Sequence, residues 1–192
     1  LVKEWVTDET GTIQFMGLPA GAYLVEEAEP LAGYQLLAEP FRLTVTKDYR
    51  LQTFVLDNQK IEVSVEKRDQ ETRKFVSGAV LRLTDENGAV AAEWTTSDSP
   101  KVIRGIPAGE YWLTEVKAPE GYLLMNEPVK LSITNEAGTQ IFTVTNQKLE
   151  VDILKKDKET GELLPGAKLR LVRNQDQTVI REWESTGIAE VF

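Results

Sequence analysis

The 192-residue sequence contains no cysteine and no histidine. The lack of cysteine excludes disulfides, thiolate metal ligands and cysteine nucleophiles, and the lack of histidine excludes imidazole acid-base chemistry. No apolar run approaches the roughly 20 residues of a membrane-spanning helix. The first residues, LVKEWVTDETG, do not have the pattern of a secretory signal peptide. Any chemistry must therefore use carboxylates, amides, hydroxyls or lysine amines, and we expect no membrane contact in this segment.

Positive charge is scarce as well. Lysine and arginine number 22 against 31 aspartates and glutamates, which gives a net charge of -9, and the basic residues are scattered along the chain. This balance excludes nucleic acid as a partner, because phosphate binding needs clustered positive charge. No Asp-x-Asp-x-Asp-Gly calcium loop is present, so the acidic clusters indicate solvated surface. We therefore expect no metal and no cofactor.

Internal repetition organises the chain. Residues 17–34 recur at 105–122, residues 54–60 at 142–148 and residues 61–72 at 149–160, and each shift is 88 positions. The tryptophans Trp5, Trp94 and Trp183 recur at 89, which indicates a one-residue change in a loop. A period of this length fits a small domain better than a stacking unit of a solenoid. We expect one complete repeat at 59–147, the later part of a repeat with its first strands missing at 1–58, and the earlier part of another at 148–192.

The local pattern favours strands throughout. Ile61, Val63 and Val65 alternate with polar residues, and short apolar or alternating runs follow at 80–83, 111–116, 129–133 and 141–144. Turn signals such as Glu86-Asn87-Gly88 separate these runs. The expected fold is all-β, a mainly antiparallel sandwich of about seven strands per repeat.

Three polar residues fall on the inward face of these strands. Side chains at i, i+2 and i+4 share one face of a strand. In the complete repeat this phase points Lys67, Glu115 and Asn146 toward the core, each in line with apolar residues of its own strand. An unpaired buried charge costs several kcal/mol, so we expect the three groups to meet.

The same phase recurs in the partial repeats, with Lys155 in the last one and Glu27 and Asn58 in the first. One interpretation is an ordinary buried Lys–Glu pair with an asparagine nearby, or strand-end residues that reach solvent. The other is chemical. Burial lowers the pKa of a lysine and raises that of a glutamic acid, and a neutral amine is a nucleophile. A protonated Glu115 hydrogen-bonded to the Asn146 carboxamide oxygen would activate its carbon, giving a Lys–Asn amide crosslink with loss of ammonia.

At these residues the chain resembles the B-type repeat domains of the collagen adhesin (Cna B-type, or SpaA-like) of Gram-positive surface proteins and pilins. The resemblance covers essentially the whole chain. It rests on these motifs: Lys67-Arg68-Asp69, Gly78-Ala79 to Leu83, Pro107-Ala108-Gly109 to Tyr111 with Glu115, Pro119-Glu120-Gly121-Tyr122, and the final Asn146. The partial repeats match with Lys155-Lys156-Asp157 and Pro165-Gly166-Ala167, and with Pro19 to Tyr23, Glu27 and Asn58.

This resemblance implies tandem prealbumin-like, reverse immunoglobulin-like β-sandwiches whose first and last strands are joined by an intramolecular isopeptide bond. Carried over, Lys67 and Asn146 are the bonded pair and Glu115 is the catalytic carboxylate. Glu27 is its equivalent in the first partial repeat, where Asn58 is the crosslink candidate, and Lys155 is the candidate in the last. The reaction occurs once per repeat, so we expect no enzyme with turnover.

The resemblance also implies a function, that of stalk or shaft repeats in an extracellular, cell-wall-anchored adhesin or pilin-like protein. The expected partners are neighbouring repeats of the same protein, and host extracellular matrix through other domains. An alternative is an adhesive module in which the repeats themselves bind a host protein or carbohydrate. A further hypothesis is strand donation, in which the last piece of one molecule completes the first piece of another.

Overall fold

The computed structural model describes residues 3–48, 50–188 and 190–191 as β-strands joined by turns and loops, with no helix in these ranges. The strands of the first unit are β1 (Gly21–Val25) and β2 (Phe41–Val45). The middle unit holds β3 (Glu62–Asp69), β4 (Val80–Asp85), β5 (Val90–Thr95), β6 (Lys101–Arg104), β7 (Gly109–Lys117), β8 (Val129–Ile133) and β9 (Thr139–Asn146). The last unit holds β10 (Asp152–Ile153), β11 (Lys168–Val172), β12 (Val179–Glu184) and β13 (Glu190–Val191). The predicted all-β class is confirmed.

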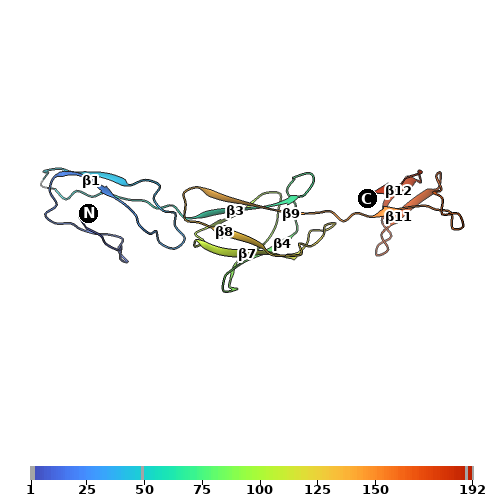
Figure 1. The fold of residues 1–192 in the computed structure, drawn as a ribbon, viewed down its shortest axis with the longest axis horizontal. Coiled ribbons are helices and arrows are strands. Elements are labelled where there is room, and N and C mark those ends of the chain that lie inside the picture. The colour runs from blue at the N-terminus through green and yellow to red at the C-terminus, as the bar shows by residue number, and fades with distance from the viewer. Residues whose placement is uncertain (1–2, 49, 189, 192) are drawn as a thin grey trace.

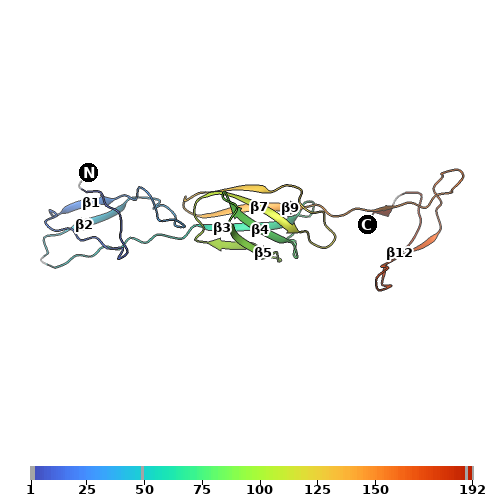
Figure 2. The ribbon, with the colours of Figure 1, turned by 90° about the horizontal axis from the view of Figure 1, so that it is seen from below.

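The middle unit is a two-layer sandwich (Figures 1 and 2). One sheet has the order β6-β3-β9 and the other the order β5-β4-β7-β8, so the sandwich has the seven strands that the pattern predicts. The turn between β4 and β5 shows how the sequence makes a hairpin. The Asp85 carboxylate accepts hydrogen bonds from the backbone N–H groups of Asn87 and Ala89, and Gly88 has a positive φ of 79°.

The first and last strands of this sandwich pair in parallel. Lys67 of β3 lies opposite Val144 of β9, and Asp69 lies opposite Asn146. Every other pairing in the sandwich is antiparallel. A parallel pair needs a long crossover connection, and here four strands of the other sheet and β6 supply it. The chain therefore enters the sandwich at one end and leaves at the other.

The core lies entirely in this unit. The apolar side chains that are buried in the described ranges run from Ile61 to Val144, and the largest fully buried ones are Ile61, Leu81, Leu83 and Leu113. Trp94 of β5 packs against this cluster, as a core tryptophan should. Alternation therefore placed the apolar faces of β3, β7 and β9 correctly.

The outer units copy parts of the middle one and lie in line with it (Figure 1). In the last unit, β11 pairs with β12 so that Leu169 faces Trp183, as Leu81 faces Trp94 in the middle unit. The two hairpins differ in their turns, which span 86–89 in one and 173–178 in the other. This difference, together with the bulge in each hairpin, accommodates the one-residue shift between Trp94 and Trp183.

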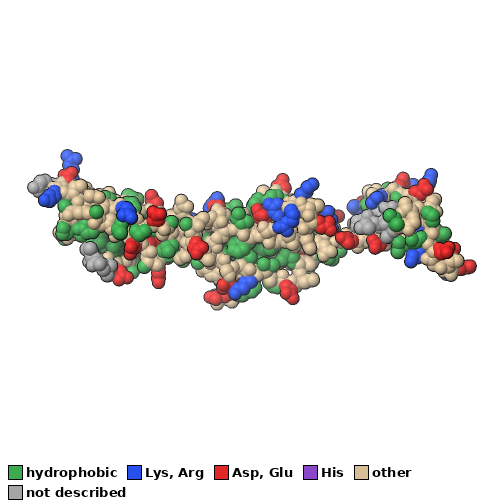
Figure 3. Space-filling model, turned by 45° about the horizontal axis from the view of Figure 1, so that its top comes forward, with side chains coloured by type: hydrophobic (Ala, Val, Ile, Leu, Met, Phe, Trp, Pro, Cys, Tyr) green, Lys and Arg blue, Asp and Glu red, His purple; other side chains and the backbone are tan. Residues whose placement is uncertain are grey.

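Charge is spread over the surface. On the face shown in Figure 3, lysine and arginine side chains lie among aspartates and glutamates and do not gather into a basic patch. Within the ranges that the structure describes, no helix is long and apolar enough to cross a membrane.

Candidate functional site

Lys67, Glu115 and Asn146 meet inside the middle sandwich. Lys67 lies near the end of β3, Asn146 ends β9 and Glu115 lies on β7 of the facing sheet. All three are buried, with exposed fractions of 2%, 4% and 3%. Two neighbouring strands thus supply the amine and the amide, and the opposite sheet supplies the carboxylate.

The lysine amine has three neighbours. Lys67 Nζ lies 3.2 Å from Glu115 Oε1, 2.9 Å from the Met125 sulfur and 3.5 Å from the backbone oxygen of Thr145. A thioether is a weak hydrogen-bond acceptor. The carboxylate of Glu115 is therefore the one charged group that compensates the buried amine among the contacts of this site.

Burial lowers the pKa of Lys67 below the usual lysine value, and the attraction of the Glu115 carboxylate offsets only part of this effect. The pKa is lowered because burial removes water from around the ammonium group, and one carboxylate is its sole ionic partner. A larger fraction of Lys67 is therefore a neutral amine than in a lysine on the surface.

The asparagine amide is oriented by acceptors. Asn146 Nδ2 donates to Glu115 Oε2 at 2.9 Å and to the backbone oxygen of Leu123 at 2.5 Å. Asn146 Oδ1 is buried without a hydrogen-bond partner. The expectation that Glu115 bonds to the amide oxygen is therefore wrong in this structure. An ionised carboxylate only accepts hydrogen bonds, so it faces the NH2 group of the amide.

Two residues of this site were missed by the sequence interpretation. The backbone N–H of Met125 donates to Glu115 Oε2 at 2.8 Å, and Leu123 supplies the carbonyl that holds Asn146. Both lie in the loop that follows β7, where side chains have no strand period to interpret. The one sequence signal for these two residues is the 88-residue repeat. It relates Met125 to Leu37 and Leu123 to Gln35, so the same loop follows the glutamate strand in both units.

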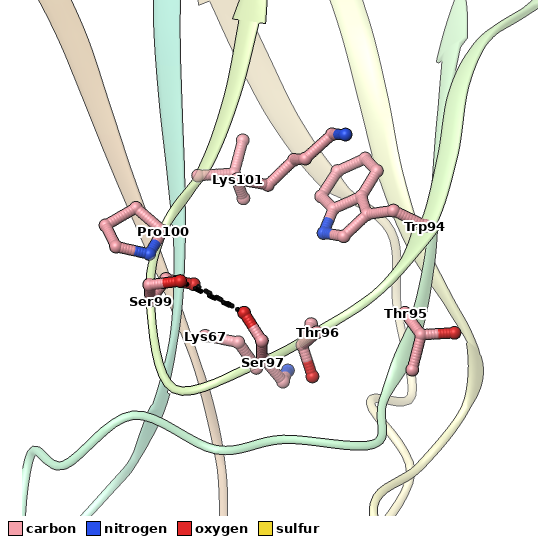
Figure 4. Close-up of a pocket in the computed structure, with 9 residues that line it drawn as sticks. Lys67, Trp94, Thr95, Thr96, Ser97, Ser99, Pro100 and Lys101 are labelled. Carbon is pink, nitrogen blue, oxygen red and sulfur yellow. Dashed lines mark hydrogen bonds between the residues drawn. The ribbon is translucent and has the colours of Figure 1, made fainter.

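A small cavity of about 60 Å³ borders Lys67 under the loop between β5 and β6. In Figure 4 this loop passes over the Lys67 side chain, and the Ser97 hydroxyl lies 3.1 Å from the Ser99 hydroxyl. The lining residues are Val65, Lys67, Trp94, Thr95, Thr96, Ser97, Ser99, Pro100 and Lys101. A volume of this size has room for a small polar molecule such as water.

Asp69, two residues beyond Lys67, ties three segments together. It accepts hydrogen bonds from the backbone and hydroxyl of Thr72 at 2.7 and 2.9 Å, and from the Tyr122 hydroxyl at 2.9 Å. Lys148 Nζ lies 3.6 Å away. The backbone hydrogen bond from Thr72 is the largest of the effects that hold the pKa of Asp69 well below its usual range. The end of β3, the loop after β7 and the exit from β9 are thus joined beside the buried site.

The first unit has the same carboxylate–amide pair. Asn58 Nδ2 lies 2.8 Å from both carboxylate oxygens of Glu27 and 3.1 Å from the backbone oxygen of Gln35, and the Leu37 N–H donates to Glu27 at 2.9 Å. The bonds to one carboxylate oxygen, to the backbone oxygen of Gln35 and from the Leu37 N–H have counterparts in the middle unit, where the second oxygen of Glu115 faces Lys67 instead of the amide. Lys155, in contrast, is exposed in the last unit and is not brought to either pair. Among the residues that the structure describes, a complete set of three is thus assembled only around Lys67.

In the described part of the chain, no group of three or more acidic side chains is arranged to hold a metal ion. The buried site itself offers one carboxylate, whose oxygens face an amine, an amide and a backbone N–H.

The fold and this buried site define a class of protein, a tandem β-sandwich with an amine, a carboxylate and an amide between its terminal strands. The chain belongs to the SpaA family of prealbumin-like fold domains, whose model matches residues 1–60 and 61–148. Among curated proteins, none matches this sequence significantly.

Several solved structures are similar to this chain. The Bacillus anthracis TIE protein aligns with 91% of this chain and 34% of its own, at 23% identity and a TM-score of 0.52. A streptococcal ancillary pilin aligns with 69% of this chain and 43% of its own, at 29% identity and a TM-score of 0.39. The minor pilin GBS52 of Streptococcus agalactiae aligns with 79% and 70%, at 20% identity and a TM-score of 0.43. This chain thus spans about a third of the length of the first of these proteins.

Proposed function

We propose that these repeats form the shaft of a Gram-positive cell-surface adhesin or pilin-like protein, and that the middle repeat crosslinks itself through a Lys67–Asn146 isopeptide bond. The observation that carries the proposal is the buried contact of Lys67, Glu115 and Asn146 between parallel terminal strands. Membership of the SpaA domain family and the 88-residue period support it.

The proposed reaction balances with the groups present. A proton passes from the Lys67 ammonium to Glu115, and the neutral Nζ attacks Cγ of Asn146. The Nζ–Cγ bond forms and the Cγ–Nδ2 bond breaks, and Nδ2 leaves as ammonia with the proton that Glu115 had taken from the lysine ammonium. Glu115 then takes up the second proton that Nζ loses as it becomes the amide nitrogen. Glu115 is well placed to protonate the leaving nitrogen, because its Oε2 already lies 2.9 Å from Nδ2. The cavity beside Lys67 is the proposed exit for the ammonia.

Confinement is what lets a poor electrophile react. An amide resists attack by an amine in water, but groups held in contact by a fold gain the large effective concentration of an intramolecular reaction. The same burial lowers the pKa of Lys67 and so supplies the neutral amine. The reaction consumes its own side chains, and each repeat undergoes it once.

The location and partners follow from this role and are part of the proposal. We place the chain outside the cell, in a wall-anchored protein, with neighbouring repeats as its immediate partners. Host matrix would be contacted through other domains of the same protein. Strand donation between the last unit of one molecule and the first unit of another stays a hypothesis that the monomeric or oligomeric state in solution tests.

The experiment is the intact mass of the full chain. We expect a deficit of one ammonia relative to the sequence, lost in Glu115→Ala and in Lys67→Arg. Glu27→Ala is the matched control, because it removes the counterpart carboxylate of the first unit, and it should keep the deficit. Fragment masses should join the peptides that contain Lys67 and Asn146. A full, unmodified mass for the unaltered protein would overturn the crosslink.

A further inference from the structure

The loop that follows β1 in the first unit is inserted into the end of the middle sandwich. Gly33 and Gln35 of this loop are buried, although the loop belongs to a connection between strands. Two turns of the middle unit receive it, the one before β7 at Gly105 and the one between β8 and β9 at 135–138. We call this contact, made by residues 33–36 with Gly105 and residues 135–138, the joint.

Hydrogen bonds across the joint come from both backbone and side chain. The Leu36 N–H donates to the Asn135 oxygen at 2.8 Å. The Gln35 side chain donates from Nε2 to the Gly138 oxygen at 3.1 Å and accepts from the Gly138 N–H at 3.3 Å. The same Nε2 lies 3.3 Å from the backbone oxygen of Lys60, at the point where the two units connect. A buried amide with both ends paired favours one geometry, because displacing it leaves polar groups unpaired.

Close backbone contact adds a steric requirement. A Cβ atom at Gly33 would lie 2.5 Å from the Gly105 oxygen, closer than any side chain allows. The backbone then continues without a spacer, since the Ile61 N–H donates to the Gly33 oxygen and β3 begins at Glu62. The units are therefore held by the connecting segment and by two separate turns.

The repeat period offers a comparison within the chain. The counterparts of Gly33 and Gln35 are Gly121 and Leu123. Gly121 has nearly the same φ, 82° against 83°, but nothing lies within 4 Å of its missing Cβ. Leu123 has no amide and is 45% exposed, whereas Gln35 is 7% exposed. The hydrogen bonds of the joint thus depend on a residue that the next connection lacks.

From these contacts we infer that the first and second repeats dock on each other in one fixed orientation, with Gln35 as the residue that locks it. The partner of the loop 33–36 is the end of the neighbouring repeat formed by Gly105 and residues 135–138. The inference does not depend on the isopeptide bond, because none of the joint residues belongs to the Lys67 site.

The same loop also holds the carboxylate–amide pair of its own unit, Glu27 and Asn58. The Gln35 backbone oxygen holds Asn58, and the Leu37 N–H holds Glu27. A shift of the joint would therefore also move the groups that orient this carboxylate–amide pair.

Because the chain has no cysteine of its own, two introduced cysteines can carry spin labels at defined positions. Spin labels on the full chain with Thr44→Cys and Ala91→Cys, both exposed, report the distance between the two repeats. We expect one narrow distance distribution in the parent, a broad one after Gln35→Leu, and no change after Leu123→Gln. Gln35→Leu installs the side chain that the second connection carries, so both repeats should keep their folds.

A second measurement needs no substitution at the joint. The amide protons of Leu36 and Gly138 are bonded only across it, so hydrogen exchange should be slow at both positions. A broad distance distribution in the parent, an unchanged distribution in Gln35→Leu, or rapid exchange at these two amides would overturn the fixed joint. The mass of the protein is independent of all three results, so failure here is distinguishable from failure of the crosslink.

Discussion

The Lys67 amine shows what a buried charge requires at the scale of a single residue. Its contacts are one carboxylate oxygen, one sulfur and a distant carbonyl, and the carboxylate is in turn held by the Met125 N–H. Removing one member of a buried ion pair costs about 3–5 kcal/mol, because the other charge stays buried and unpaired. A covalent bond between Lys67 and Asn146 would remove the lysine charge, and the proton that Glu115 retains from the reaction would leave the site without an unpaired charge.

Asp69 carries a pH-dependent part of the stability. Its pKa is held well below its usual range by Thr72, Tyr122 and Lys148, so the folded state binds this proton less readily than the unfolded state does. The stabilisation is complete above the unfolded pKa of about 3.9 and is lost as the pH falls through the folded value. Asp69→Asn should therefore lower the thermal midpoint at neutral pH and make its decline below about pH 4 shallower.

Thermal unfolding between neutral and acid pH measures this effect. Asp157→Asn is the matched control, because Asp157 caps the corresponding turn of the last unit through Glu159 and Thr160 but has neither a tyrosine nor a lysine partner among its hydrogen bonds. Its substitution should change the midpoint of the middle repeat little. Equal effects of the two substitutions would contradict the role given to Tyr122 and Lys148.

At the scale of elements, strand period decided what the sequence could predict. Alternation in β3, β7 and β9 pointed Lys67, Glu115 and Asn146 inward, and the buried phases of these strands agree. The expected number of about seven strands includes the short strands β5 and β6, but the pattern did not locate them, because they face solvent along much of their length and lack a clear apolar face. The loop residues Met125 and Leu123 were missed for the same reason, since a loop has no repeating face.

Pairing direction was also beyond the sequence pattern. Alternation gives the face of a strand but not the direction of its neighbour. The sandwich is mainly antiparallel, as expected, but alternation could not show that β3 and β9 are the strands that pair in parallel. The position of the asparagine amide is a further example. The amide oxygen of Asn146 was expected to contact Glu115. Instead the amide nitrogen faces Glu115, because both the Glu115 carboxylate and the Leu123 carbonyl accept hydrogen bonds from it.

The parallel terminal strands lead to a mechanical prediction. Force applied to the two ends of the middle repeat enters through β3 and leaves through β9, so a Lys67–Asn146 bond would carry it. When the parent is stretched in a single-molecule instrument, the 78 residues between the joined positions should add no extension. Lys67→Arg should give an added step of roughly 260 Å, from about 3.3 Å per extended residue.

The contour length gained in each unfolding event is the quantity to compare. Lys155→Arg is the control, because Lys155 is exposed in the last unit and has no counterpart pair beside it. It should behave as the parent does. A full-length step in the parent protein would show that no covalent bond bears the load.

Across the whole molecule, stability is concentrated in the middle unit. All buried apolar side chains of the described ranges lie between Ile61 and Val144, whereas the outer units consist of hairpins with partly exposed apolar residues such as Leu24 and Ile180. Regions with few buried contacts open more often and are cut first by proteases.

Limited proteolysis of the full chain should therefore leave a resistant fragment close to residues 61–148, identified by its mass. The joint should slow cleavage around residues 33–36, so Gln35→Leu should speed cutting there while the resistant fragment remains. Survival of the outer units for as long as the middle one would contradict this order.

The parallel arrangement of β3 and β9 also affects how such a protein changes over generations. The chain enters a repeat at one end and leaves at the other. Duplication or loss of one 88-residue period therefore changes the length of the array by one unit and leaves the direction of the chain along the array unchanged. A sandwich with antiparallel terminal strands would return the chain to its starting side at each copy. Copy number can therefore vary by recombination as a simple adjustment of length.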